Sequence, residues 1–347
     1  MVEKIDIKEL SYKELEKIIT EQGFPSYRTG QIFHWVYQKK VSSFSEMNNI
    51  PHNFITRLSS LFQLNSLQCI KKMESRDSSQ KFLFRLGDNH IIESVLIKDR
   101  KRNTVCLSTQ VGCLRHCLFC ASGKDGFKRN LTAGEIVSQL LAIGENSGEH
   151  INNIVFMGMG EPFDNYEQLM KSIEIINEKQ GINIGARKIT ISTCGIIPGI
   201  KKFAQNPLQA ELSVSLHAAE DNIRNFLMPV NKKYPLIKLI PACKDYVKKK
   251  KRQITFEYMM LKGVNDSQEQ VKKLCHLISD FQPKAKVNLI IYNPVFKQTR
   301  LSRSEDNVVV YFQRTLKKCH IPVTIRYSKG QDIEAACGQL RGTFLNL

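Results

Sequence analysis

The feature that most constrains the fold is a regular alternation of apolar strand patterns with helical patterns, which starts at residue 104. Each strand segment is a nearly continuous apolar run, as is typical of parallel strands covered by helices on both faces. The alternation predicts an α/β fold, a partial parallel (β/α)6 barrel, and it disfavours a sandwich. The strands expected in this barrel are 104–108, 153–157, 186–192, 211–217, 254–261 and 286–294. A capping box formed by Thr132 and Glu135 is expected to open the helix after the first of them.

Two smaller regions precede the barrel. Helical patterns fill the first of them, and one begins at a capping box formed by Ser11 and Glu14. Two strand patterns, 81–86 and 91–97, follow and predict a hairpin. We therefore expect three parts: a small helical N-terminal domain (1–75), a β-hairpin connection (76–103), and the barrel with a C-terminal segment (104–347).

The charge of the chain suggests its partner. It carries 51 Lys and Arg against 33 Asp and Glu, which gives a formal net charge of +18 and favours a polyanion, of which nucleic acid is the commonest. The N-terminus lacks the apolar core of a signal peptide, and no apolar run reaches the roughly 18 residues of a membrane helix. We therefore expect a cytoplasmic protein without a membrane partner. In that compartment, the ten cysteines should be thiols, metal ligands or catalytic groups rather than a disulfide framework.

A short loop after the first barrel strand concentrates sulfur. Cys113, Cys117 and Cys120 stand at C-x3-C-x2-C spacing, and Cys106 precedes the first of them by seven residues. Three soft thiolates suit either zinc or an iron–sulfur cluster. A closed zinc site needs a fourth ligand, but the nearby His116 adjoins a ligand already used and no second C-x-x-C follows. A cluster held by three cysteines leaves one iron open to a small molecule. The spacing favours the cluster, while a non-catalytic iron–sulfur or zinc RNA-binding protein remains the alternative.

Further polar signatures follow other barrel strands, at the carboxyl ends where such folds place their chemistry. Together with the cysteine loop, the glycine-rich GMGEP (158–162) resembles the radical S-adenosylmethionine (SAM) superfamily. A longer series of motifs resembles the RlmN family of radical SAM RNA adenine-C2 methyltransferases, within the RlmN/Cfr group of 23S rRNA methyltransferases. These motifs are CLSTQVGCLRHCLFCASGKDGFKRNLTAGEI, VFMGMGEP, ITISTCGIIPGI, LSVSLHA, LMPVN, VNLIIYNP and DIEAACGQLRG, in this order.

The resemblance implies the cofactors and the residues that hold them. It implies one [4Fe-4S] cluster held by Cys113, Cys117 and Cys120, whose open iron binds SAM, with two SAM molecules used per turnover. The cleaved cofactor yields a 5′-deoxyadenosyl radical. The residues that it implies for SAM binding are Gly160, Glu161, Ser192, Ser215, Leu216, His217 and Asn293. For His217, the alternative is a structural histidine at a strand end, whose hydrogen bonds are made within the protein.

The resemblance also implies a methyl relay through the protein. Carbon 2 of adenine is electrophilic, so it cannot attack the methyl group of SAM directly. In the family, a cysteine that matches Cys337 first takes the methyl group and then carries it into a transient covalent adduct with the RNA. A second cysteine, which matches Cys106, releases the product by closing a disulfide bond with Cys337. Glu93 matches a proton acceptor.

The substrates implied are an adenosine in 23S rRNA and an adenosine next to the anticodon in some tRNAs. Val111, GKDGF (123–127) and Pro162 favour carbon 2, whereas STCGIIPGIKK (192–202) is closer to the Cfr-like relatives that methylate carbon 8. An electron donor such as flavodoxin or ferredoxin is implied, and we expect a monomer.

RNA binding requires basic side chains beside the site. Lys124, Lys128 and Arg129 follow the cysteine loop, and 100–102 is a second basic group. The densest charge run, 248–252, is interpreted as a solvated helix end, with phosphate contact as the alternative. The N-terminal domain is expected to help dock folded RNA.

Overall fold

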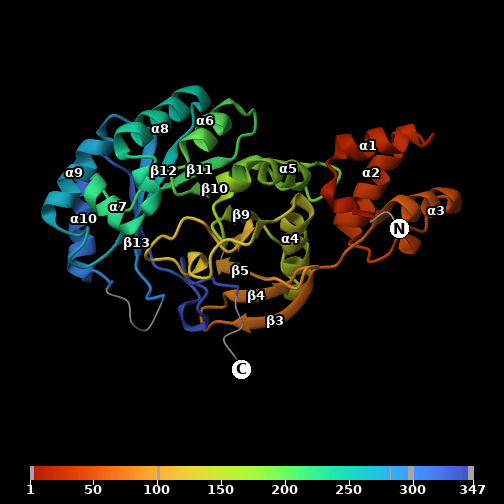
Figure 1. The fold of residues 1–347 in the computed structure, drawn as a ribbon, viewed down its shortest axis with the longest axis horizontal. Helices are drawn as coiled ribbons and strands as arrows, with labels where there is room; N and C mark the ends of the chain where they lie inside the picture. The colour runs from red at the N-terminus through yellow and green to blue at the C-terminus, as the bar shows by residue number, and fades with distance from the viewer. Residues whose placement is uncertain (1–3, 100–101, 282, 296–300, 343–347) are drawn as a thin grey trace.

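One ten-stranded sheet forms the centre of the chain (Figure 1). The computed structural model describes residues 4–99, 102–281, 283–295 and 301–342. The strands of the sheet lie in the order β14-β13-β12-β11-β10-β9-β6-β5-β4-β3, so neighbours in sequence are neighbours in space. Two short pairs, β1-β2 and β7-β8, lie outside it.

The larger part of the sheet is parallel. Its strands are β6 (Arg102–Cys106), β9 (Asn153–Phe156), β10 (Ile189–Thr193), β11 (Glu211–Ser215), β12 (Ile254–Met260), β13 (Ala285–Ile291) and β14 (Val323–Arg326). Every adjacent pair among them is parallel, which confirms the predicted partial barrel. The strand β14 was not predicted and extends the barrel at its far edge.

Helices return the chain between these strands and cover the sheet from outside (Figure 1). They are α4 (Ala133–Ser147), α5 (Tyr166–Asn177), α6 (Ile197–Gln205), α7 (Asp221–Leu227), α8 (Leu236–Lys250), α9 (Gln268–Ser279) and α10 (Asp306–Lys318). The predicted capping box at Thr132 and Glu135 opens α4. Short 3₁₀ turns complete the loops: η4 (Ala121–Gly123), η5 (Pro162–Asn165), η6 (Ala186–Lys188), η7 (Pro229–Lys232) and η8 (Gln331–Ile333).

An antiparallel extension completes the sheet. It consists of β3 (Gln68–Glu74), β4 (Gln80–Arg85) and β5 (Ile91–Asp99), and β5 pairs antiparallel with β6. The β4–β5 pair is the predicted hairpin. In this register Val95 lies opposite both Lys81 and Cys106. Because directly opposed residues share a face, Lys81, Glu93 and Cys106 lie on the same face of the sheet.

The N-terminal helices stand at one end of the molecule (Figure 1). They are η1 (Ile7–Glu9), α1 (Tyr12–Glu21), α2 (Arg28–Phe33), its π-helical continuation η2 (His34–Lys39), η3 (Phe44–Glu46) and α3 (His52–Leu61). Polar contacts join them to the barrel: among others, Gly134 N donates to Glu9 Oε2 at 3.0 Å, and Lys171 pairs with Glu14 at 2.9 Å.

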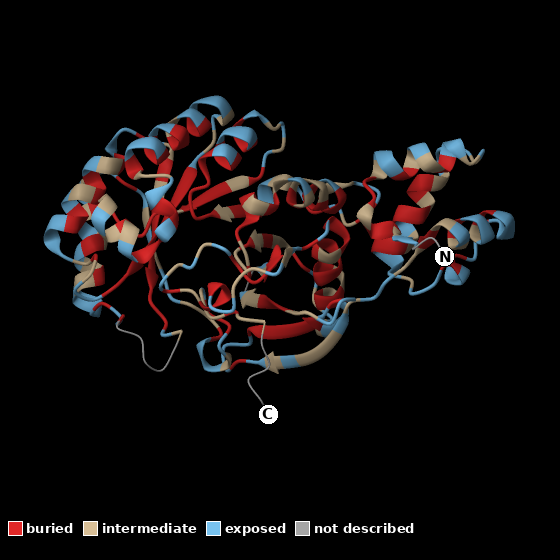
Figure 2. Cartoon of the chain, in the orientation of Figure 1, coloured by how far each residue is buried: buried red, intermediate tan, exposed pale blue. Residues whose placement is uncertain are grey.

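The hydrophobic core runs along the strands and the inner faces of the helices, while exposed residues cover the outer faces (Figure 2). Within the described part of the chain, no helix is both long and apolar enough to cross a bilayer.

The remaining short strands flank these parts. They are β1 (Ile5–Asp6), β2 (Phe62–Gln63), β7 (Gln110–Val111) and β8 (Arg129–Asn130). The β7–β8 pair brackets the cysteine loop, because β7 precedes it and β8 follows it. The loop is therefore closed at its base by a strand pair.

Candidate active site

The cysteine loop is a compact structure anchored to the next strand–helix unit. Cys113 Sγ accepts a hydrogen bond from Arg115 N at 3.4 Å, and Cys120 N donates to Cys117 O at 3.0 Å. The Arg115 guanidinium forms a two-pronged ion pair with Asp164, with Nε to Oδ2 at 2.6 Å. Such a planar pair fixes direction as well as distance, so it orients the loop on the barrel.

The three predicted ligand thiols lie in one electrostatic environment. Desolvation raises the pKa of Cys113 to about 12, and it also raises the pKa of Cys117 and of Cys120. The charges of Cys113 and Cys120 raise the pKa of Cys117 further, so the sulfurs lie near one another. A bound cation would reverse this penalty because it stabilises thiolates. Three soft donors from one loop fit an iron–sulfur cluster, although no three described His, Cys, Asp or Glu side chains are arranged to hold a single metal ion.

The GMGEP loop lies against the turn that follows β6. A Cβ added to Gly158 would lie 2.6 Å from Leu107 O, and one added to Gly160, whose φ is +99°, would lie 2.6 Å from Gln110 Cβ. Thr109 N donates to Met159 O at 2.9 Å. Only glycine permits this close approach of two backbones at the strand ends.

The Glu161 carboxylate is buried and engaged within the protein. It accepts from Phe163 N at 3.0 Å and from Cys194 N at 2.7 Å. Desolvation raises its pKa. Because both oxygens already accept backbone hydrogen bonds, this side chain fixes the loop to the end of β10.

His217 connects the end of β11 to the cysteine loop. Its Nδ1 accepts from Met259 N at 3.0 Å, and its ring packs edge-on against Phe119 with centroids 4.7 Å apart. Burial lowers the pKa of His217 to about 3, so the imidazole is neutral at physiological pH. On the same side of the site, Leu118 N donates to Leu227 O at 2.9 Å.

A residue that the sequence did not reveal, Arg224, joins the ends of β10 and β11. Its guanidinium is fully buried and donates to the carbonyls of Cys194 at 2.7 Å, Ser215 at 3.1 Å and Leu216 at 3.1 Å. Asn231 Oδ1 accepts from Nη1 at 2.6 Å. The only local signal was its position just before the LMPVN motif.

The remaining residues predicted to bind SAM lie at or just beyond strand ends. Ser192 and Ser215 are half-buried near the ends of β10 and β11. Asn293 is buried beyond β13, and its Nδ2 donates to Ser328 Oγ at 2.7 Å. The structure thus places the predicted residues of these three strands at one edge of the barrel.

The C-terminal segment lies directly on the cysteine loop. Ala121 N donates to Gly338 O at 2.7 Å, and Ser122 Oγ donates to Leu340 O at 2.6 Å. A Cβ on Gly338 would lie 2.7 Å from Phe119 O. Cys337, one residue before this contact, is therefore held beside the loop that carries the three predicted ligands.

Cys337 and Cys106 approach each other across the site. Desolvation raises the pKa of Cys106, and the charge of Cys337 raises it further. Cys337 is exposed to solvent. Even so, desolvation of its thiol raises its pKa, and the charges of Glu257 and Cys120 raise this pKa further. Both properties fit a thiol in a concave site that water reaches. Cys106 and Cys337 are free thiols, so the implied disulfide bond is not supported in this state.

Lys81 and Glu93 hold the C-terminal segment through hydrogen bonds on the two sides of Cys337. Lys81 Nζ lies 3.5 Å from Glu93 Oε2 and donates to Glu334 O at 3.1 Å. Glu93 Oε1 accepts from Gly342 N at 3.1 Å. Desolvation raises the pKa of Glu93, and the Lys81 charge partly offsets that rise. No sequence motif pointed to the role of Lys81.

The basic side chain of Arg129 is already paired. Its guanidinium contacts Asp88 and donates to Glu135 Oε2 at 2.7 Å, so it offers RNA less free charge than the sequence predicts. Two further residues proposed for RNA contact, Arg100 and Lys101, lie outside the described residues.

Other predicted phosphate contacts remain accessible. Arg102, Lys124 and Lys128 are exposed. In the 248–252 run, Lys250 donates to Leu208 O at 2.6 Å, so at least this member of the run has a role inside the protein.

A partial barrel with a three-cysteine loop after its first parallel strand defines a radical SAM enzyme. Residues 107–275 match the Radical SAM superfamily, and residues 5–64 match the Ribosomal RNA large subunit methyltransferase N-terminal domain. Together with relatives that are 45% identical over nearly the whole chain, these matches show that the chain belongs to the RlmN family of radical SAM RNA methyltransferases. Members of the superfamily bind a [4Fe-4S] cluster and SAM, and RlmN enzymes use two SAM per turnover.

Two curated relatives carry the description "Probable dual-specificity RNA methyltransferase RlmN". The one from Halalkalibacterium halodurans is 45% identical over 96% of this chain and 92% of its own. The one from Staphylococcus haemolyticus is 45% identical over 98% of this chain and 93% of its own. A solved radical SAM methyltransferase from Sphaerobacter thermophilus matches with a TM-score of 0.91 and 41% identity, over 98% of this chain and 100% of that one.

Proposed function

We propose that this enzyme methylates carbon 2 of an adenosine in 23S rRNA and an adenosine next to the anticodon in some tRNAs. The single observation that carries the proposal is the hydrogen bond from Ala121 N to Gly338 O, which holds Cys337 beside the cysteine loop. A methyl carrier must reach both the cofactor and the target base, and this contact supports that position. Two RNA substrates agree with the "dual-specificity" description of the relatives.

Cys113, Cys117 and Cys120 hold the cluster in this proposal. When bound there, the cluster would supply the electron for cleavage of SAM into methionine and a 5′-deoxyadenosyl radical. Gly160, Ser192, Ser215, Leu216, His217 and Asn293 position SAM, and Glu161 acts by fixing the GMGEP loop because both of its oxygens are engaged. The neutral His217 offers SAM one N–H donor, since its other ring nitrogen accepts from Met259.

Cys337 is the proposed methyl carrier. Its thiolate attacks the methyl carbon of one SAM molecule, so that an S–CH₃ bond forms on Cys337 and S-adenosylhomocysteine leaves. The 5′-deoxyadenosyl radical from a second SAM would take one hydrogen atom from this methyl group. The sulfur-bound carbon would then add to carbon 2, and the unpaired electron of the adduct would return to the bound cluster. The proximity of Cys337 to Cys120 supports this role, because the carrier must lie within reach of the cofactor.

Cys106 and Glu93 complete the cycle. Glu93 accepts the proton from carbon 2. Burial raises the pKa of Glu93, which makes its carboxylate a stronger base for this step. Cys106 then attacks the sulfur of Cys337, so that an S–S bond forms while the S–C bond to the product breaks, and the released carbon takes up a proton to become the methyl group. The charge of Cys337, which raises the pKa of Cys106, supports this pairing.

The partners follow from the same chemistry. Flavodoxin or ferredoxin supplies the electron, and the enzyme works as a monomer in the cytoplasm. The exposed Arg102, Lys124 and Lys128 attract the RNA backbone. The N-terminal domain, residues 1–75, docks folded RNA and leaves cofactor cleavage to the barrel.

The Cfr-like reaction at carbon 8 is the second candidate, favoured by the segment 192–202. Mass spectrometry of 23S rRNA from a strain that lacks the gene separates the two. We expect loss of the methyl group from carbon 2 and its return when the gene is restored. Unchanged carbon 2 methylation would contradict the proposal, and loss confined to carbon 8 would establish the alternative.

A further inference from the structure

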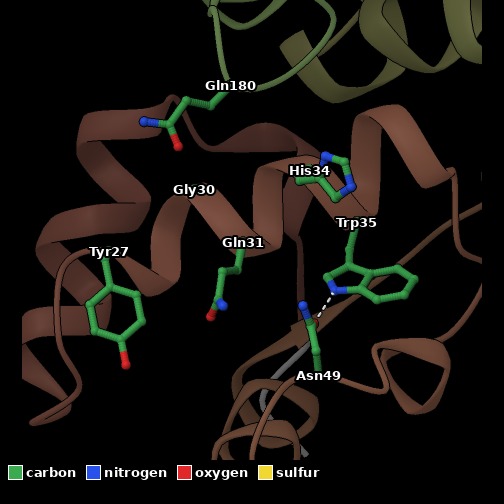
Figure 3. Close-up of a pocket in the computed structure, with 7 residues that line it drawn as sticks. All are labelled: Tyr27, Gly30, Gln31, His34, Trp35, Asn49 and Gln180. Carbon is green, nitrogen blue, oxygen red and sulfur yellow. Dashed lines mark hydrogen bonds between the residues drawn. The ribbon is translucent and has the colours of Figure 1, made fainter.

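A pocket of 260 Å³ lies on the N-terminal helices, and none of its lining residues belongs to the cysteine loop (Figure 3). Its walls come from α2, η2 and the segment after η3, and one side chain comes from the loop after α5. The residues that line it are Tyr27, Gly30, Gln31, His34, Trp35, Asn49 and Gln180. None of them has a place in the methyl transfer described above.

The pocket is built across the seam between the N-terminal helices and the barrel. A Cβ on Gly30 would lie 1.8 Å from Gln180 Oε1, so glycine alone lets this side chain rest on the helix. Nearby, Gln38 Nε2 donates to Gly181 O at 3.1 Å. The barrel therefore supplies one wall and holds the helix at a fixed position.

Hydrogen bonds determine which way two amides of the pocket point. Arg28 Nη1 donates to Gln31 Oε1 at 2.7 Å. Trp35 Nε1 donates to Asn49 Oδ1 at 2.7 Å (Figure 3). Guanidinium and indole N–H groups are donors only, so each amide must present its oxygen to them. The NH₂ groups of Gln31 and Asn49 make no hydrogen bond to another described residue, and they are left as donors for a ligand.

The other walls suit a flat, uncharged ring. Tyr27 and Trp35 lie toward opposite ends of the pocket with Gln31 between them (Figure 3), and 59% of Tyr27 is exposed. The lining residues include no Asp or Glu, and Arg28 stands 5.0 Å over the Tyr27 ring as a cation for a neighbouring phosphate. The volume lies below the roughly 300–1,000 Å³ of sites for drug-sized ligands, so a single base fits better than a whole cofactor.

We propose that this pocket binds one unpaired nucleobase of the RNA substrate, at a distance from the target adenosine. The inference rests on the proposed function for its RNA. Unpaired bases in RNA loops are recognised by stacking on aromatic side chains and by hydrogen bonds to their edges. Both amide oxygens already accept a hydrogen bond within the protein, so the two-way amide pair that reads adenine is disfavoured, whereas the two NH₂ groups are available as donors. The pocket therefore favours bases that present carbonyl acceptors, such as uracil or guanine, over adenine.

The only tryptophan of the chain, Trp35, reports occupancy directly. Titration of the cluster-loaded enzyme with protein-free 23S rRNA should quench Trp35 fluorescence in step with binding. Short oligouridine should quench at lower concentration than oligoadenosine. Unchanged fluorescence at saturating rRNA, or preference for oligoadenosine, would overturn the proposal.

Two variants test the walls separately. Tyr27→Ala removes an exposed stacking surface, and Asn49→Asp replaces the donor while it keeps the oxygen that Trp35 requires. Each should weaken rRNA binding about tenfold. The matched control is Tyr311→Ala, on α10, where a tyrosine is also exposed and binding should not change. Wild-type affinity in both pocket variants would refute the site.

RNA-independent methylation of Cys337 should be equal in all of these proteins, which keeps failure of the pocket distinct from failure of the methyl relay. If the wild-type enzyme bound rRNA through this pocket but left carbon 2 unmethylated, the result would support the base-binding site and contradict the proposed function.

Discussion

Cys106 lies on β6, where strands on both sides pair with its backbone, whereas Cys337 lies in a C-terminal segment whose only regular element among the described residues is η8. Cys106 is 8% exposed, while Cys337 is open to solvent. The segment is held at its two ends by Lys81 and Glu93 and near its middle by Gly338. A fixed thiol and a mobile thiol can meet only if the mobile one moves, so the difference supports the proposed roles of Cys337 in methyl carriage and of Cys106 in product release.

The largest expected effect comes from removing the Cys337 thiol. Cys337→Ala should abolish RNA methylation, because no other thiol among the described residues is held against residues 119–122 in the same way. The cluster absorption band should remain, since the variant keeps Cys113, Cys117 and Cys120. Residual RNA methylation by an intact, cluster-loaded Cys337→Ala protein would contradict the proposal that Cys337 carries the methyl group.

Removal of the fixed thiol should stop the cycle at a different point. Cys106→Ala should accumulate a covalent protein–RNA adduct, because nothing then attacks the sulfur of Cys337. Denaturing gel electrophoresis with labelled RNA measures the adduct. Cys275→Ala is a buried-cysteine control on α9, where turnover should continue. Continued turnover without an adduct in Cys106→Ala would refute the assignment.

Replacement of Lys81, which binds the segment that carries Cys337, should have a smaller effect that depends on pH. Lys81→Met removes the charge that lowers the pKa of Glu93, so that pKa should rise further. A general base works in its ionised form, and activity falls as pH drops through its pKa. The acid limb of the pH–rate profile should therefore move to higher pH, with a loss of about 10–100-fold below it. Lys81→Arg should restore the profile, and an unmoved acid limb in Lys81→Met would contradict the role of this ion pair.

The smallest effect should come from weakening the contact between Gly338 and the cysteine loop. Gly338→Ala places a Cβ 2.7 Å from Phe119 O, which must push the segment off the cysteine loop. We expect methylation of Cys337 to slow about tenfold, since misplacement by about 1 Å can cost up to 10²-fold. Gly126→Ala is the matched control: its φ of +73° is equally left-handed, but nothing lies within 4 Å of the added carbon. Equal rates for the two variants would show that the contact does not position Cys337.

Local signals in the sequence predicted local structure well. The capping boxes at Ser11 and Thr132 begin helices where predicted, because a cap depends only on residues three positions apart. The four-residue strand β14 escaped detection because its side chains alternate between half-buried and exposed, without the apolar run that marked the other strands.

The sequence could not reveal contacts between distant segments. The pairing of Arg129 with Asp88 and the burial of Arg224 under three carbonyls depend on the folded arrangement of loops. The same holds for Lys81, which pairs with Glu93 only because the β4–β5 register brings their side chains to one face. The resemblance to a family pointed to Cys106, Cys337 and Glu93, but the way they are held became visible only in the structure.

The most direct test of the methyl relay is peptide mass spectrometry of the enzyme after incubation with methyl-labelled SAM in the absence of RNA. The relay predicts one labelled methyl group on the sulfur of Cys337 and none on Cys106. A label on Cys106, or an unlabelled Cys337 in an enzyme that still methylates RNA, would contradict it.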